Sequence, residues 1–172
     1  VPQSPSFDRG DPVSVLDFFT AATARWPVCL PIPGKSRGRC RRSLERVHGG
    51  DLLDKPMGGL SGGQLQRVCI ARAIATRPRF IVFDEAISSL DVSVQAQVLE
   101  LLLELKGDMT YLFIAHDVQA VTYLCDHIMF LHEGTIVESL EREHLARASS
   151  GYAQRLLQSV IPFNPDACVA TV

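Results

Sequence analysis

Apolar segments of two kinds alternate along the middle of the chain, between positions 51 and 138. Two short runs, 80–83 and 111–115, are almost wholly apolar, as expected for buried strands of a parallel sheet. Longer segments carry apolar residues at helical spacing, which predicts amphipathic helices, at 65–76, 92–106 and 118–125. Strands that alternate with helices indicate an α/β fold with right-handed crossovers.

Less regular sequence lies on both sides of these segments. Residues 1–50 are rich in Pro, Gly, Ser and Arg, and only 13–22 shows a helical pattern. Runs at 128–131 and 135–137 predict two strands that are joined as a hairpin. We therefore expect an α/β core with a weakly patterned N-terminal part.

Composition narrows the class of protein. The 172 residues are 47% hydrophobic and 21% charged, with a net charge of −2. Disorder over the whole chain and a polycation built for nucleic acid are therefore both excluded. The five cysteines lack CxxC spacing, which argues against a disulfide framework or a zinc site and suits a reducing cytosol. No apolar run reaches the length of a membrane span, and no secretory signal is visible. The first residue is Val1 rather than an initiator methionine, which favours a fragment of a longer protein.

Polar side chains follow both short apolar runs. Asp84 and Glu85 come directly after 80–83, and His116 comes directly after 111–115. Ligands of open α/β sheets bind beyond the carboxyl ends of the strands. There one carboxylate can hold Mg²⁺ through water, and its neighbour can orient or deprotonate an attacking water. Taken alone, a solvated acidic turn and a structural histidine explain these residues equally well.

A glycine-rich segment, 60–64, opens the first predicted helix. Ser61 and Gln64 stand at the spacing of a capping box. Gly62 and Gly63 let backbone N–H groups approach a ligand closely, and a helix N-terminus attracts anions. The segment therefore suits a phosphate, although an ordinary glycine-rich helix cap has the same local pattern.

Together these segments resemble the ATP-binding cassette (ABC) ATPase family. Four ordered motifs carry the resemblance: 60–64 is similar to the ABC signature, 80–85 to Walker B with its catalytic glutamate, 88–91 to the D-loop, and His116 to the switch histidine. Residues 1–5 resemble the Q-loop, with Gln3 as its glutamine. The segments 91–99 and 151–162 are similar to those of peptide and nickel importers.

The resemblance implies a role for each motif. Catalytic roles fall to Glu85, which acts on water, and to His116 and Gln3, which contact the γ-phosphate region. The metal, Mg²⁺, is held by Asp84 and Gln3. The signature residues contact the ATP that a partner subunit holds: Ser61, Gly62, Gly63 and Gln64. The D-loop aspartate, Asp91, couples the two ATP sites across the interface.

The same resemblance implies a fold, cofactors and partners. The expected fold is a partial ABC-type nucleotide-binding domain, α/β, with a mostly parallel sheet, flanking helices and a poorly defined helical subdomain. ATP and Mg²⁺ are the cofactors. A second ABC ATPase subunit, identical or different, and transmembrane permease subunits are the partners, with no nucleic acid. The location is peripheral, on the cytoplasmic face of the cell membrane.

The expected domain, 1–162, is an incomplete ABC ATPase domain. It begins with a Q-loop region at 1–12 and a helical subdomain at 13–59, whose pattern is too weak to predict its folding. A core from signature to switch follows at 60–138, and a C-terminal helical element at 139–162. Residues 163–172 form a tail after the domain.

The family's Walker A motif precedes the Q-loop, so we expect it before Val1. The string Gly34-Lys35-Ser36 imitates its end, but Cys29 stands where the first glycine belongs, and neither a strand nor an apolar helix is predicted around it. The arginine-rich run 37–46 is compatible with nucleic-acid or anionic-lipid binding. A poorly folded subdomain, or a stretch altered by compensating frame changes, explains the run as well.

These observations favour an ATP-binding and ATP-hydrolysing subunit of an ABC importer for peptides or for nickel and other metal complexes, truncated and inactive alone. Whether the chain is an enzyme stays open, because Walker A is not in it. The alternatives are a remnant that neither binds ATP nor dimerises, and an ABC ATPase of the DNA-repair type.

Overall fold

The computed structural model describes residues 1, 7–8, 10–23, 34–107 and 109–159. The chain divides into two compact units, Val1–Ile114 and Ala115–Val172. The first unit contains, in chain order, α1 (Val15–Thr23), α2 (Gly34–Glu45), η1 (Gly50–Leu52), η2 (Met57–Gly59), α3 (Gly62–Ile74), β1 (Phe80–Asp84), α4 (Val92–Lys106) and β2 (Thr110–Ile114). The second contains α5 (Val118–Leu124), β3 (His127–His132), β4 (Thr135–Glu141), η3 (Arg142–Arg147) and α6 (Gly151–Ser159).

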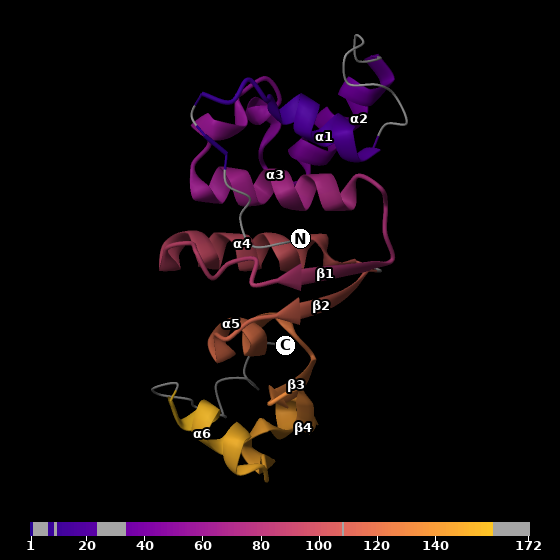
Figure 1. Cartoon of the computed structure of the whole chain (residues 1–172). Helices are drawn as coiled ribbons and strands as arrows, with labels where there is room; N and C mark the ends of the chain where they lie inside the picture. The colour runs from indigo at the N-terminus through magenta and orange to yellow at the C-terminus, as the bar shows by residue number, and fades with distance from the viewer. Residues whose placement is uncertain (2–6, 9, 24–33, 108, 160–172) are drawn as a thin grey trace. The chain divides into compact units, whose positions relative to one another are not determined.

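A parallel pair of strands, β1 and β2, forms the sheet of the first unit (Figure 1). The inward face is aromatic, since Phe83 lies edge-on to Tyr111 with ring centroids 5.1 Å apart and also contacts Phe113. Edge-to-face ring pairs of this kind stabilise a core beyond the area that they bury. The strand pattern at 80–83 and 111–115 predicted both strands to within one residue of their ends.

The opposite face of this sheet is apolar and partly exposed. It consists of four side chains at alternating positions of the two strands, which we name the apolar sheet face: Phe80, Val82, Leu112 and Ile114. Next to it, Val1 extends the hydrogen bonding of β1, because its amino group donates to the carbonyl of Val82 and its carbonyl accepts from the N–H of Asp84 at 3.0 Å.

The helices of the first unit pack in succession, with α1 and α2 on one side of α3 and α4 on the other (Figure 1). The described residues between 13 and 50 therefore include two α-helices, whereas the sequence pattern predicted one. The second, α2, was missed because its apolar stripe is narrow: Cys40 and Leu44, with Val47 in the turn that follows, are fully buried among exposed arginines. A cation–π contact, with the Arg72 guanidinium 4.1 Å from the Phe18 ring centroid, joins α3 to α1.

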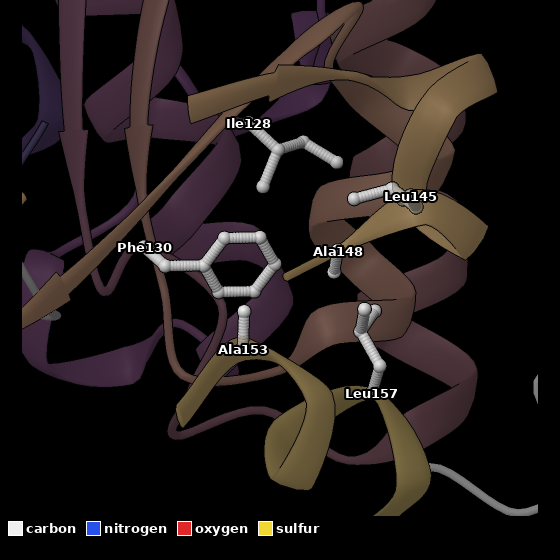
Figure 2. Packing of buried hydrophobic residues seen from close by; sticks show 6 residues of the cluster. All are labelled: Ile128, Phe130, Leu145, Ala148, Ala153 and Leu157. Atoms are coloured by element: carbon white, nitrogen blue, oxygen red, sulfur yellow. The ribbon is translucent and has the colours of Figure 1, made fainter. Parts of the chain in front are cut away.

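The second unit is an antiparallel hairpin, β3–β4, covered by η3 and α6. Figure 2 shows Ile128 and Phe130 of β3 pointing toward Leu145, Ala148, Ala153 and Leu157. The turn uses left-handed backbone at Glu133 and Gly134, with φ of 48° and 76°. Before α6, the carboxylate of Glu138 accepts the N–H groups of Ser149 and Ser150 at 2.7 and 2.9 Å, and these bonds lower the pKa of Glu138. The hairpin and the C-terminal helix both agree with the sequence pattern.

The architecture is thus α/β, as the sequence predicted, with one parallel and one antiparallel strand pair in the described residues. Among those residues, Cys40 and Cys69 are free thiols, and burial raises the pKa of Cys40 to about 12. None of the described helices combines the length and the apolar character that crossing a membrane requires.

One buried polar side chain in α3 stands out. Gln66 is fully buried, and neither its amide nitrogen nor its amide oxygen has a hydrogen-bond partner among the described residues. Burying an amide without partners costs free energy that an apolar side chain of similar size does not cost.

We therefore expect Gln66→Leu to raise the free energy of unfolding by about 1 kcal/mol. Urea unfolding followed by circular dichroism measures it. The matched control is Gln158→Leu on the exposed side of α6, which should stay within about 0.5 kcal/mol of the original chain. A loss of stability in Gln66→Leu larger than that of the control would contradict the prediction.

Candidate functional site

The candidate site begins at the N-terminus of α3. Ser61 is its N-cap: the Ser61 hydroxyl accepts the N–H of Gln64 at 3.3 Å, and the Gln64 side-chain oxygen accepts the N–H of Ser61 at 3.1 Å. The capping box that the sequence predicted is confirmed. A hydroxyl that accepts this bond still has its hydrogen to donate, and the first N–H groups of a helix have no acceptor within it. Ser61 and Gly62 are exposed, so these donors are accessible.

Of the two glycines of this segment, Gly62 lies against the loop before α4 and Gly63 against the first turn of α4. A Cβ on Gly62 would come 3.1 Å from Leu90 Cδ2, and one on Gly63 would come 2.7 Å from Val94 Cγ1. Only hydrogen fits at Gly63 without movement of its neighbour. The structure therefore brings the segments 60–64 and 88–94 side by side, with the glycines as the close contact.

Asp91 begins α4 and has a local role that the sequence reading did not assign to it. Its carboxylate accepts the N–H of Val94 at 3.0 Å and the hydroxyl of Ser93 at 2.7 Å. Both bonds favour the ionised form and lower the pKa of Asp91, the hydroxyl bond more strongly. An aspartate directly before an apolar-periodic segment is an N-cap signal, so the sequence did contain this information.

Gln95 holds the loop 87–90 from within α4 and was also missed. Its side-chain amide donates to the carbonyl oxygens of Ile87 at 3.1 Å and Leu90 at 3.0 Å. Two donations from one amide fix the loop between the strand β1 and the helix α4. No local pattern could indicate this, because a glutamine in a polar helix face is ordinary.

The two carboxylates lie at the carboxyl end of β1, as predicted. Asp84 is the last residue of the strand, with an exposed side chain. Glu85 has left-handed backbone, with φ of 46°, a conformation that is uncommon for residues with side chains. Three bonds hold it there: its N–H donates to the carbonyl of Ile114 at 2.9 Å, and its carbonyl accepts the N–H and the hydroxyl of Ser88 at 3.2 and 2.8 Å.

Other predicted site residues are placed differently. Gln3 lies outside the described residues. His116 belongs to the second unit, two residues after β2, and its position at the same edge as Asp84 stays a prediction. The string Gly34-Lys35-Ser36 forms the first turn of α2; the described element before it is the helix α1, not a strand.

The donors present suit a magnesium nucleotide better than a metal ion alone. Among the described residues, no cluster of three or more His, Cys, Asp or Glu could enclose a metal. Mg²⁺ in nucleotide sites is commonly bound through one or two carboxylates, phosphate oxygens and water. Asp84 supplies one exposed carboxylate, while Ser61 and the start of α3 supply donors for an anion.

The comparison with protein families agrees with this geometry. The family model described as "ABC transporter" matches residues 3–88. This is half of the chain, so the chain belongs to the ABC transporter family. The resemblance found in the sequence is confirmed, and the fold is that of the ABC ATPase domains.

Individual relatives are similar in sequence or in structure. The chain is 45% identical over 113 residues to the "Metal-staphylopine import system ATP-binding protein CntF" of Staphylococcus aureus, covering 64% of this chain and 45% of that protein. It is 50% identical over 103 residues to the "Oligopeptide transport ATP-binding protein OppF" of Streptococcus pyogenes serotype M1, covering 58% and 34%. A solved "putative metal-chelate type ABC transporter" matches with a TM-score of 0.74 and 25% identity, covering 92% of this chain and 62% of that one. The chain spans less than half the length of these curated relatives.

The close glycine contact leads to a stability prediction. Gly63→Ala should lower the free energy of unfolding by about 1–2 kcal/mol, because crowding of the stiff Val94 side chain outweighs the roughly 1 kcal/mol of helix propensity gained. Denaturant unfolding measures it. Gly34→Ala, at the start of α2 with nothing within 4 Å, is the control and should be neutral or slightly stabilising.

A second change separates crowding from other effects. Val94→Ala in the Gly63→Ala background removes the clashing methyl groups, so the two substitutions should couple favourably in a double-mutant cycle. Strict additivity of the two losses would show that the contact is not the cause.

The Asp91 cap predicts a pH dependence. A carboxyl whose folded pKa lies below its ordinary value of 3.8 stabilises the fold above that value and loses this contribution as the pH falls through the folded pKa. The difference in free energy of unfolding between the original chain and Asp91→Asn should therefore be constant above about pH 5. In more acidic solution the original chain should lose stability relative to Asp91→Asn. Chemical unfolding at several pH values measures the difference; a difference that does not vary with pH would refute this.

Proposed function

We propose that the chain is part of an ATP-binding subunit of an ABC importer for peptides or metal complexes such as nickel. It would act on ATP together with a second ABC ATPase subunit, on the cytoplasmic face of the cell membrane beside permease subunits. The proposal is supported by the names of its relatives, which refer to metal-staphylopine import and to oligopeptide transport. The observation that carries it furthest is the packing of the signature-like segment, 60–64, on the D-loop-like segment, 88–91.

The signature segment would serve an ATP that the partner subunit holds. Ser61 presents a hydroxyl hydrogen, and the N–H groups of Gly62 and Gly63 have no acceptor in α3. Gln64 takes part indirectly, since its side chain fixes Ser61. Donors that are already in place stabilise charge that develops on a transferring phosphoryl group without reorganisation.

The residues at the end of β1 would serve the chain's own nucleotide. ATP with Mg²⁺ supplies the phosphoryl group that is transferred to water. Asp84 would hold the metal ion, and Gln3 would contribute to the same position. Glu85 would take the proton of the attacking water, with its orientation fixed by the bonds of its backbone to Ile114 and Ser88. His116 would contact the γ-phosphate region.

Asp91 would connect the two sites. Its carboxylate caps α4, and the loop before it contacts Gly62 of the signature through Leu90 and also binds the side-chain amide of Gln95. A partner subunit that presses on this loop would therefore press on the signature segment as well. This is the physical basis for expecting the two sites of a pair to act together.

The experiment tests the signature in trans. The chain is mixed with a full-length ABC ATPase partner that has an intact Walker A but a substituted signature serine, and phosphate release is followed. We expect stimulation by the chain, and its loss in Ser61→Arg, because the arginine fills the phosphate position. The control, Ser159→Arg, changes an exposed serine in α6 and should stimulate like the original chain.

Two results would overturn the proposal. Equal stimulation by Ser61→Arg and Ser159→Arg would exclude the signature as the active element. A chain that is folded by circular dichroism yet gives no stimulation, under conditions where a full-length pair is active, would favour the inert remnant.

A further inference from the structure

Arginines of α2 and of the turn directly after it are arranged in a row that the proposed function does not use. Arg39, Arg42 and Arg46 recur at spacings of three and four residues, which places them on one face of a helix. The helical hydrogen bonding continues to the last of them, since the N–H of Arg46 donates to the carbonyl of Arg42 at 3.3 Å. We name these three residues the arginine row. All three are exposed.

The row lies on the exposed face of this segment, and Arg46 at its end also lies near Tyr111 of β2. Cys40, Leu44 and Val47 lie on the other face of the same segment and are fully buried. Because the apolar face of α2 is occupied by packing inside the first unit, the helix has none left to insert into another apolar phase. Whatever the row binds, it binds by charge and hydrogen bonding.

The charge of the row is not compensated within the described part of the chain. Arg37, on another face, forms two bonds of 2.8 and 2.7 Å to the carboxylate of Asp54. In the same described part, no ion pair links Arg39, Arg42 or Arg46 to a carboxylate. Three guanidinium groups along about two turns of helix therefore present a concentrated positive charge on a protein whose net charge is −2.

We propose that the arginine row docks on anionic phospholipid headgroups at a membrane surface. This inference rests on the proposed function in one respect, since an importer subunit works beside a membrane. Guanidinium groups match phosphate in shape and charge. A straight row suits a flat field of phosphates, and α2 carries no aromatic side chain of the kind that stacks on nucleic-acid bases.

The expected strength of headgroup binding follows from the number of basic side chains near the membrane surface. Each basic side chain near an anionic surface strengthens binding about fivefold, so the row as a whole accounts for roughly a hundredfold. The attraction is screened by salt, because exposed charges are shielded beyond a Debye length. It requires no nucleotide, no partner subunit and no residue of the candidate site.

The test is flotation of the purified chain with lipid vesicles. Vesicles of phosphatidylcholine alone are compared with vesicles that also contain phosphatidylglycerol, at low and at high sodium chloride. We expect binding to the anionic vesicles only, with loss at high salt. The triple variant Arg39→Gln, Arg42→Gln, Arg46→Gln should bind them roughly a hundredfold more weakly.

A second triple variant controls for net charge. Arg79→Gln, Arg147→Gln and Arg155→Gln remove the same charge from exposed positions outside α2 and should leave vesicle binding almost unchanged. Circular dichroism and urea unfolding verify that both triple variants fold. The expected pattern is therefore a large loss in one variant and none in the other.

Three results would overturn the inference. These are no preference for anionic vesicles, equal losses in both triple variants, and tighter binding of a DNA or RNA oligonucleotide than of vesicles at equal salt. The last would assign the row to nucleic acid. Failure of the proposed function is distinguishable, because vesicle binding should be the same in Ser61→Arg as in the original chain, whereas stimulation of a partner ATPase should not.

Discussion

The close approach of α3 to the first turn of α4 and to the loop before it is the contact on which the candidate site depends. A Cβ on Gly63 would lie 2.7 Å from Val94 Cγ1, so the backbone of α3 lies directly against a side chain of α4. The donors of Ser61 and the cap of Asp91 take their relative positions from this contact. The capping hydrogen bonds of Ser61 and Asp91 are local to the start of α3 and of α4. These bonds alone do not fix the distance between the two residues.

The surrounding structure fixes the same loop from two more directions. Gln95 holds two of its carbonyl groups, and the turn at Glu85 is tied both to β2 and to Ser88. A loop with this many anchors responds to a push as a unit. A rigid loop passes a displacement on to the segments that it contacts, whereas a soft loop would absorb the movement.

The sequence predicted the strands, α3, α4, α5 and the hairpin because these have strong local patterns: apolar runs, helical periodicity and turn residues. It could not predict α2, whose apolar stripe is narrow and interrupted by arginines. The neighbours of the signature glycines were also beyond it, because Leu90 and Val94 are distant in sequence and only folding brings them near. The motifs located Ser61, Asp84, Glu85 and Asp91 correctly on their elements, whereas the joint position of Gln3 and His116 stays a prediction.

The apolar sheet face has a consequence for handling the chain. Four large side chains, of which Phe80 is 54% exposed, cover one side of a two-stranded sheet. Exposed apolar surface of this kind favours association with other apolar surface. Copies of the isolated chain should therefore adhere through this side as their concentration rises. Light scattering will increase well below the concentrations that crystallisation or NMR spectroscopy demands, so dilute-solution methods suit this chain best.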